Sequence, residues 1–168
     1  PAAPAVAVVR GLGFLFYGPG GQDGGSGIDR RFAPVQDAAQ AVINALNTLE
    51  TAGETPLTDA VTQAVEVLEG IEESGSIVLA TDGKETGQGA PCQLAAQLSD
   101  SPVTVHVIGF KVRGEYFDFG GDDNNEYDNA ETVSRCLADR TGGLYVGVEN
   151  AKELISAFHK TLGCPLLF

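Results

Sequence analysis

The sequence has little positive charge. Ten Lys and Arg residues stand against 23 Asp and Glu residues, and the formal net charge of the 168-residue chain is −13. Such a surface repels phosphate backbones and anionic lipid head groups. The charge therefore predicts no nucleic-acid partner and no attachment to membranes through basic residues, while it suits the binding of cations. A plainer interpretation, in which the acidity only keeps the protein soluble, stays open.

Long apolar runs are also missing. No run is long enough to span a bilayer, so we expect no membrane insertion. The opening Pro1-Ala-Ala-Pro4 lacks the charged and apolar regions of a signal peptide, and any targeting segment is expected to be absent or already removed. Apolar residues still make up 43% of the chain. That share and the length predict one packed domain over residues 1–168.

The sequence lacks the common motifs of catalysis. It has no G-x-S-x-G nucleophile turn and no phosphate-binding P-loop, because the "GQDGGSG" stretch has the wrong register. It has only two His residues, and no Ser/His/Asp grouping stands out. A phosphotransfer site with a second Asp two residues after Asp82 is excluded, since that position is Lys84. We therefore predict a protein that is not an enzyme.

Three cysteines, Cys92, Cys136 and Cys164, are present in no zinc-type spacing. One disulfide with one remaining thiol fits a protein outside the cytoplasm, and three buried free thiols are the alternative.

Apolar periodicity predicts the order of the elements. Strands are expected at 12–17, 28–34, 76–81, 103–110 and 144–148, and helices at 35–49, 57–71, 90–99, 130–140 and 150–162, the last with Asn150 as its N-cap. From residue 56 onward helices and strands alternate. This alternation is typical of an α/β fold: a doubly wound, mainly parallel sheet with helices on both faces.

Two polar residues lie where such a sheet binds ligands, beyond the carboxyl ends of its strands. Asp82 follows the apolar strand in "SIVLATDGKET", and Thr55 precedes a helix in "GETPLTDA". A hydroxyl and a carboxylate suit a hard cation such as Mg²⁺. Spacing alone favours a simpler interpretation, in which Thr55 caps the helix before Pro56 and Asp82 shapes a turn. His106, inside the predicted strand 103–110, is expected to be a satisfied core residue rather than a ligand.

Four blocks of sequence resemble a known family. "GETPLTDAVTQAVEVL", "SIVLATDGKET", "VTVHVIGF" and "TGGLYVGVENAKELISAF" are similar, in order and spacing, to a von Willebrand factor type A (VWA) domain of the bacterial, secreted or periplasmic kind. The resemblance covers nearly the whole chain. It implies a Rossmann-like fold, a non-enzymatic role in protein binding and adhesion, and a location outside the cytoplasm. It also implies a metal-ion-dependent adhesion site (MIDAS) for Mg²⁺, Mn²⁺ or Ca²⁺, completed by an exposed carboxylate of a protein partner.

The resemblance assigns Thr55 and Asp82 to two of the five ligand positions of that site. The other three belong to an Asp-x-Ser-x-Ser motif after the family's first strand, which is central in the sheet. This motif is not found, since Asp23 and Ser26 have the wrong register, and residues 1–11 align with the end of the family's first helix. The first strand is thus expected upstream, on another chain, or not at all. An incomplete site would instead suit a metal-independent structural or assembly subunit that binds neighbouring subunits.

Residues 113–129 are expected to form a long acidic and aromatic loop, and loops of this length are often functional. The expected binding surface includes Asp118, Asp122, Asp123, Glu126, Tyr116, Phe119 and Tyr127. The carboxylates lack the spacing of an EF-hand, so a solvated specificity loop is favoured over a calcium site. The aromatic residues would suit a protein interface or would pack the loop onto the domain.

The predicted fold also suggests a disulfide. Cys136, late in its helix, and Cys164, after the last helix, would both lie at the end of the sheet away from the ligand. The expected bridge is Cys136–Cys164, with Cys92 left over.

Overall fold

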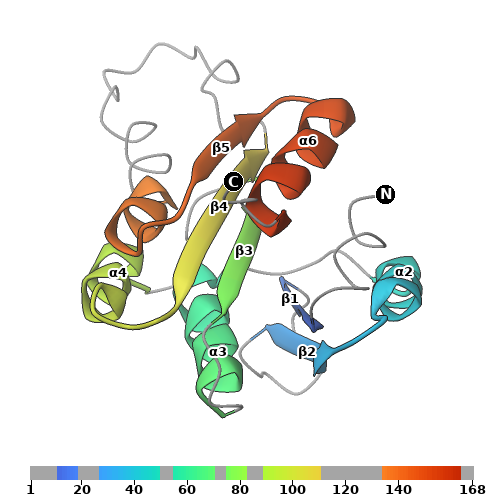
Figure 1. Ribbon diagram of the computed structural model, residues 1–168, viewed down its shortest axis with the longest axis horizontal. Helices are drawn as coiled ribbons and strands as arrows, with labels where there is room; N and C mark the ends of the chain where they lie inside the picture. The colour runs from blue at the N-terminus through green and yellow to red at the C-terminus, as the bar shows by residue number, and fades with distance from the viewer. Residues whose placement is uncertain are drawn as a thin grey trace, which may run out of the picture.

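The computed structural model describes residues 11–18, 27–49, 55–70, 75–82, 89–110 and 134–163. Its elements, in chain order, are β1 (Leu12–Tyr17), β2 (Ile28–Val35), α2 (Ala39–Asn47), α3 (Leu57–Gly70), β3 (Ser76–Thr81), α4 (Pro91–Leu98), β4 (Thr104–Phe110), β5 (Tyr145–Val148) and α6 (Ala151–Leu162) (Figure 1). Residues 134–140 are also helical. Every predicted element is present in type, and the strand at 76–81 has the predicted bounds.

The predicted start of the first helix is wrong by four residues, whereas several other boundaries differ by one or two. The helix expected from residue 35 begins only at Ala39, because Val35 pairs with Leu12 as the last residue of β2. A turn follows in which Asp37 adopts a left-handed backbone with φ 53. An Asp tolerates this conformation better than most residues. Val35 thus fits the apolar spacing of the following helix although it belongs to the strand, and this coincidence misplaced the predicted helix start.

A parallel sheet of order β3-β4-β5 forms the centre of the fold. Ser76 to Thr81 pair in register with Thr104 to Gly109, and Val107 to Phe110 pair with Tyr145 to Val148. Val105 and Val107 belong to one buried cluster with α3 and α4, whereas Ile108 belongs to a second cluster with Ala157 of α6. Side chains of one strand alternate between the faces of a sheet. Helices therefore cover both faces, and the predicted doubly wound α/β fold is confirmed.

A separate sheet of two antiparallel strands, β1 and β2, lies beside β3 (Figure 1). We call it the hairpin sheet. Within it, the centroids of the aromatic rings of Phe14 and Phe32 lie 6.3 Å apart. Helix α3 contacts β1, β2 and β3, so it bridges the hairpin sheet and the parallel sheet.

The last helix begins with a reciprocal cap. The side chain of Asn150 accepts hydrogen bonds from the backbone N–H groups of Lys152 and Glu153, and Glu153 accepts one from the backbone N–H of Glu149 at 2.9 Å. This arrangement satisfies N–H groups that have no partner within the helix. The predicted N-cap is confirmed.

Candidate functional site

The parallel strands end together at one edge of the sheet, which we call the carboxyl edge. β3 ends at Thr81, β4 at Phe110 and β5 at Val148. Thr81 is buried, whereas Asp82, the next residue, is exposed. The strand therefore holds the Asp82 carboxylate at the carboxyl edge, as predicted, and leaves it open to solvent.

Thr55 stands just before α3. The backbone N–H of Leu57 donates to the Thr55 carbonyl at 3.0 Å, and Pro56 and Leu57 are buried. Only residues 71–75 separate the end of α3 from the start of β3, so the helix runs back along the strand. At 1.5 Å per helical residue α3 is about 21 Å long, and six strand residues span about 20 Å. The helix start, with Thr55, therefore lies toward the same carboxyl edge as Asp82.

These two residues offer a hydroxyl and a carboxylate, which are the oxygen donors that a hard cation takes. A magnesium shell has about six ligands, so Thr55 and Asp82 would supply only part of it. Within the described ranges, no group of three or more His, Cys, Asp or Glu residues could hold a metal ion. The donor chemistry fits a divalent cation, and the remaining ligands would have to come from water or from other groups.

The predicted binding surface lies outside the described residues. This applies to Tyr116, Asp118, Phe119, Asp122, Asp123, Glu126 and Tyr127, and also to Asp23, Ser26 and Cys164. Phe110 ends β4 at the carboxyl edge, and Ser134 begins the next described helix.

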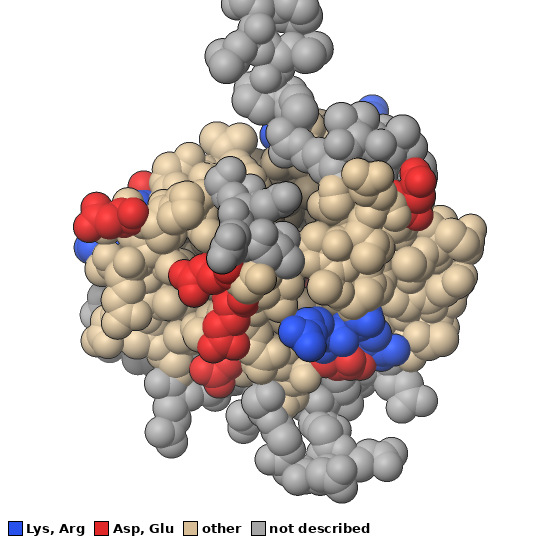
Figure 2. Space-filling model, turned by 60° about the horizontal axis from the view of Figure 1, so that its bottom comes forward, with Lys and Arg blue, Asp and Glu red and all other residues tan. Residues whose placement is uncertain are grey.

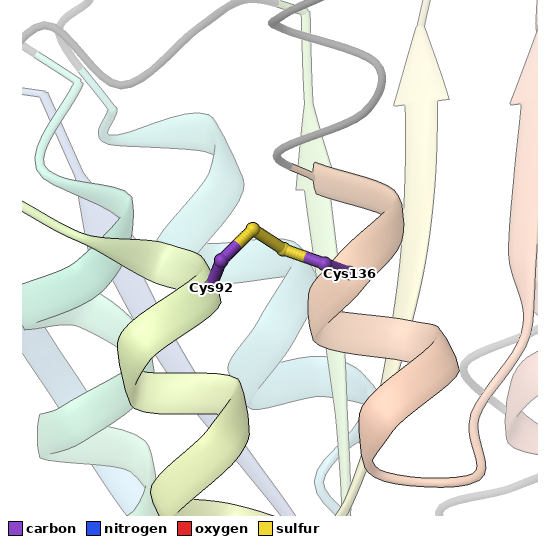
Figure 3. Close-up of a disulfide and its surroundings, with 2 residues drawn as sticks. All are labelled: Cys92 and Cys136. Carbon is purple, nitrogen blue, oxygen red and sulfur yellow. A yellow bond between two sulfur atoms is a disulfide. The ribbon is translucent and has the colours of Figure 1, made fainter.

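The disulfide prediction is wrong in its pairing. Cys136 is bonded to Cys92, not to Cys164 (Figure 3). The Cα atoms of Cys92 and Cys136 are 5.5 Å apart, within the usual range. Helix α4 and the helical residues 134–140 follow β3 and β4, which are neighbouring strands, and both helices pack into the same buried cluster. Cys92 and Cys136 therefore meet beside the carboxyl edge. The order of the two helices after neighbouring strands could have predicted this pairing from the sequence.

His106 has a structural role, as the sequence predicted. The backbone N–H of Leu144 donates to His106 Nδ1 at 3.0 Å. Burial lowers the pKa of the His106 imidazole, because the charged form loses water. A neutral ring is the form that accepts this hydrogen bond. His106 also lies in the first half of β4, away from the carboxyl edge.

Tyr17 was missed in the sequence. Its hydroxyl donates to the backbone carbonyl of Ala80 at 2.7 Å, across the boundary between the hairpin sheet and the parallel sheet. Tyr17 also packs against the buried cluster on the α3 side. No local pattern signals a contact over 63 residues of sequence, so only the tertiary structure reveals it.

Charges on the surface are not evenly spread. Figure 2 shows one face, on which Asp and Glu side chains form separate groups, the largest group of Lys and Arg lies beside acidic side chains, and smaller basic groups lie at the edges of the view. The described surface visible in this view has no extended basic stripe of the kind that follows a nucleic-acid backbone. Among the described helices, none is long and apolar enough to cross a membrane.

A doubly wound sheet with polar residues at its carboxyl edge defines a class of ligand-binding α/β domain. The sequence matches the family model of the von Willebrand factor type A domain over residues 28–157. The chain belongs to this family. Membership indicates a role in protein–protein interaction, adhesion or assembly, and VWA domains are generally interaction modules rather than enzymes.

The chain is 35% identical over 79 residues to "Uncharacterized protein YwmC" of Bacillus subtilis (strain 168), a match that covers 46% of this chain and 35% of that protein. The matched part is thus about a third of the relative's length. Two solved structures share the fold. An aerotolerance-related membrane protein from Bacteroides fragilis gives a TM-score of 0.64 at 17% identity, covering 96% of this chain and 84% of the other. Proximal thread matrix protein 1 from the mussel byssus gives 0.63 at 18%, covering 94% and 37%.

Proposed function

We propose that this VWA domain is a non-enzymatic binding module that holds a divalent cation at its carboxyl edge through Thr55 and Asp82. The position of Asp82 carries the proposal. Its carboxylate is exposed directly after a buried strand end, at the edge where open α/β sheets bind ligands. When bound, Mg²⁺, Mn²⁺ or Ca²⁺ would also be coordinated by an oxygen of an exposed carboxylate on a protein partner.

The Cys92–Cys136 bridge supports a location outside the cytoplasm, where disulfides persist. We accordingly place the protein in an extracellular or periplasmic setting. The seven acidic and aromatic residues between 116 and 127 that the sequence singled out would contribute the surface that binds the partner. Aromatic residues commonly anchor protein interfaces.

Binding of Mn²⁺ to the full chain, measured by isothermal titration and by the spin-resonance signal of free Mn²⁺, tests the proposal. Asp82→Asn should lower the affinity by about tenfold or more, because the site loses one charged ligand. Thr55→Val, which keeps the side-chain shape, should weaken binding less. Asp100→Asn is the matched control, since Asp100 is an exposed carboxylate beyond the end of α4.

An Asp82→Asn variant that binds Mn²⁺ as well as the parent would refute the cation site. The alternative is then favoured: a metal-independent subunit that assembles with neighbouring subunits. One observation supports this alternative, because the described residues contain no group of three or more His, Cys, Asp or Glu side chains that could hold a metal ion. It predicts that chelation with EDTA leaves partner binding unchanged.

A further inference from the structure

Strand β5 forms an outer edge of the parallel sheet. Among the described elements it pairs with β4 alone, in the order β3-β4-β5 (Figure 1). Its sequence, "YVGV", contains no charged residue and no proline, and Leu144 just before it is 49% exposed. Charges and proline are devices by which natural sheets keep an exposed edge from pairing. The composition of β5 therefore permits pairing with a further strand.

The hydrogen-bond register of β5 identifies the backbone groups on its outer side. The backbone N–H of Val107 in β4 donates to the Leu144 carbonyl at 2.8 Å. Residues 144, 146 and 148 therefore direct their backbone groups toward β4, and residues 145 and 147 direct theirs outward. The outward row ends there, because the backbone N–H of Glu149 donates to the Glu153 side chain at 2.9 Å. Pairing at this edge would thus centre on residues 145–147.

The two outward residues differ in size and lie on the same face of the sheet. Tyr145 packs against the buried cluster on the α3 side, whereas Val146 packs on the α6 side. Gly147, two residues after Tyr145, shares the face of Tyr145. Gly147 is exposed, and a Cβ there would meet nothing within 4 Å. A bulky ring and an open space therefore follow each other along the edge.

We propose that β5 pairs with β5 of a second copy of this chain, antiparallel across a two-fold axis. In this register Tyr145 lies opposite Gly147 of the second copy, and Val146 lies opposite Val146 at the axis. Each Tyr145–Gly147 pair exchanges two backbone hydrogen bonds, and the Tyr145 ring covers the open space beside the glycine. The contact is isologous, since each copy contributes the same surface. The proposal does not depend on the cation site.

Charge favours a second copy as the occupant. Each copy has a net charge of −13, so two copies repel each other over much of their surface, but β5 itself is uncharged. The Arg135 guanidinium carbon lies 4.4 Å from the centroid of the Tyr145 ring, and the exposed Glu149 follows the other end of the strand. In the antiparallel register Glu149 of the second copy is diagonal to Tyr145, a separation that long side chains span. The two-fold axis therefore brings Arg135 of each copy toward Glu149 of the other.

Sedimentation of the full chain over a series of protein concentrations is the first test. Two paired strands of four residues bury less surface than a permanent dimer needs, so a weak, reversible dimer is expected. As the dimer forms, hydrogen exchange of the Gly147 amide should slow. The amides of Val146 and Val148, whose backbone groups face β4, should not change. A monomer at every concentration would overturn the proposal and favour a strand from a different protein.

Reversed charges test the two-fold arrangement. Arg135→Glu alone and Glu149→Arg alone each set like charges against each other across the axis, so each variant should dimerise about tenfold or more weakly than the parent. A mixture of the two variants should recover the dimer, because every contact then joins opposite charges. Lys160→Glu, in the last turn of α6, changes the net charge as much as Arg135→Glu does and should dimerise like the parent.

The mixture is measured by labelling one variant with a fluorophore and following its sedimentation as the other is added. A mixture that stays monomeric while the parent dimerises would refute the two-fold register. Equal dimerisation of the parent and both single variants would place the contact on another surface. Thermal unfolding of the dilute proteins shows whether each variant folds. If Arg135→Glu does not fold, the weaker dimer of Glu149→Arg and the exchange of the Gly147 amide decide.

Discussion

The parallel sheet and the hairpin sheet have similar apolar strands but different burial. In the parallel sheet Val105, Val107 and Ile108 have no exposed surface. In the hairpin sheet no residue of β1 or β2 is fully buried, although β1 is entirely apolar or aromatic. The difference follows the layers around each sheet, because described helices cover both faces of the parallel sheet, whereas the described contacts of the hairpin sheet with the rest of the fold are those of α3 and of Tyr17. An apolar strand thus becomes a core strand only when its neighbours enclose it.

The largest expected effect contrasts the two sheets directly. Ile108→Ala should lower the free energy of unfolding by about 2–5 kcal/mol, because the cavity lies in a closed core. Phe14→Ala in the hairpin sheet should cost about 1 kcal/mol, since Phe14 is only half-buried. Urea denaturation measures both. Ile43→Ala, at a residue that is 44% exposed, is the control and should stay within about 0.5 kcal/mol. Equal losses for Ile108 and Phe14 would remove the contrast.

Loss of the disulfide should have the next largest effect on the free energy of unfolding. The local effect should be confined to the helices that pack on the parallel sheet. Cys92 and Cys136 close a loop of 44 residues. Replacing both by Ser should cost about 2–4 kcal/mol, because the unfolded chain regains conformational freedom. Amide exchange should quicken in α4 and remain unchanged in β1. Peptide mapping without reduction should recover Cys92 linked to Cys136, and a Cys136–Cys164 peptide would contradict the structure.

Close packing at the start of β5 should give a moderate effect. A Cβ on Gly143 would overlap the backbone carbonyl of Val105, whereas a Cβ on Gly147 would meet nothing within 4 Å. Gly143→Ala should cost about 1–3 kcal/mol, since backbone has to shift. Gly147→Ala, four residues later, is the matched control and should be nearly neutral. Thermal unfolding of the two variants gives the comparison, and a neutral Gly143→Ala would mean that the turn is not tightly packed.

The smallest expected effect is a pH dependence. Burial lowers the pKa of His106 in the folded state below its usual 6.5. Above that value both states are neutral and stability is complete. As the pH falls from about 6.5 toward the lowered pKa, the unfolded chain binds a proton first, so stability decreases. The melting temperature should therefore drop modestly between pH 7.5 and 5. His106→Gln should remove this component; a variant with the parent's full pH dependence would assign it to other groups.

Much of the fold could be predicted from the sequence. The alternation from residue 56 onward predicted the parallel sheet, and Asn150 predicted the start of α6, because caps and apolar periodicity are local properties. The four blocks of sequence identified the family, and the match over residues 28–157 confirms it. The placement of Asp82 at the carboxyl edge followed from the strand alone.

Other features could not be predicted because they depend on contacts between distant segments. The Cys92–Cys136 bridge requires two helices to meet on one face of the sheet. The Tyr17 hydrogen bond to Ala80 depends on how the hairpin sheet lies beside β3. The cation site, which the resemblance assigns to Thr55 and Asp82, stays a prediction that the Mn²⁺ titration tests.

The sequence by itself determined the elements, the parallel order of the second half of the chain and the acidic character of the surface. These properties arise from backbone preferences, apolar spacing and fixed charges, which act over a few residues. Only the tertiary structure decided which cysteines pair, which apolar strands are enclosed and that the Tyr17 hydroxyl donates to the Ala80 carbonyl. Those outcomes depend on which surfaces meet in space, because burial and hydrogen-bond pairing are properties of the packed molecule rather than of any segment.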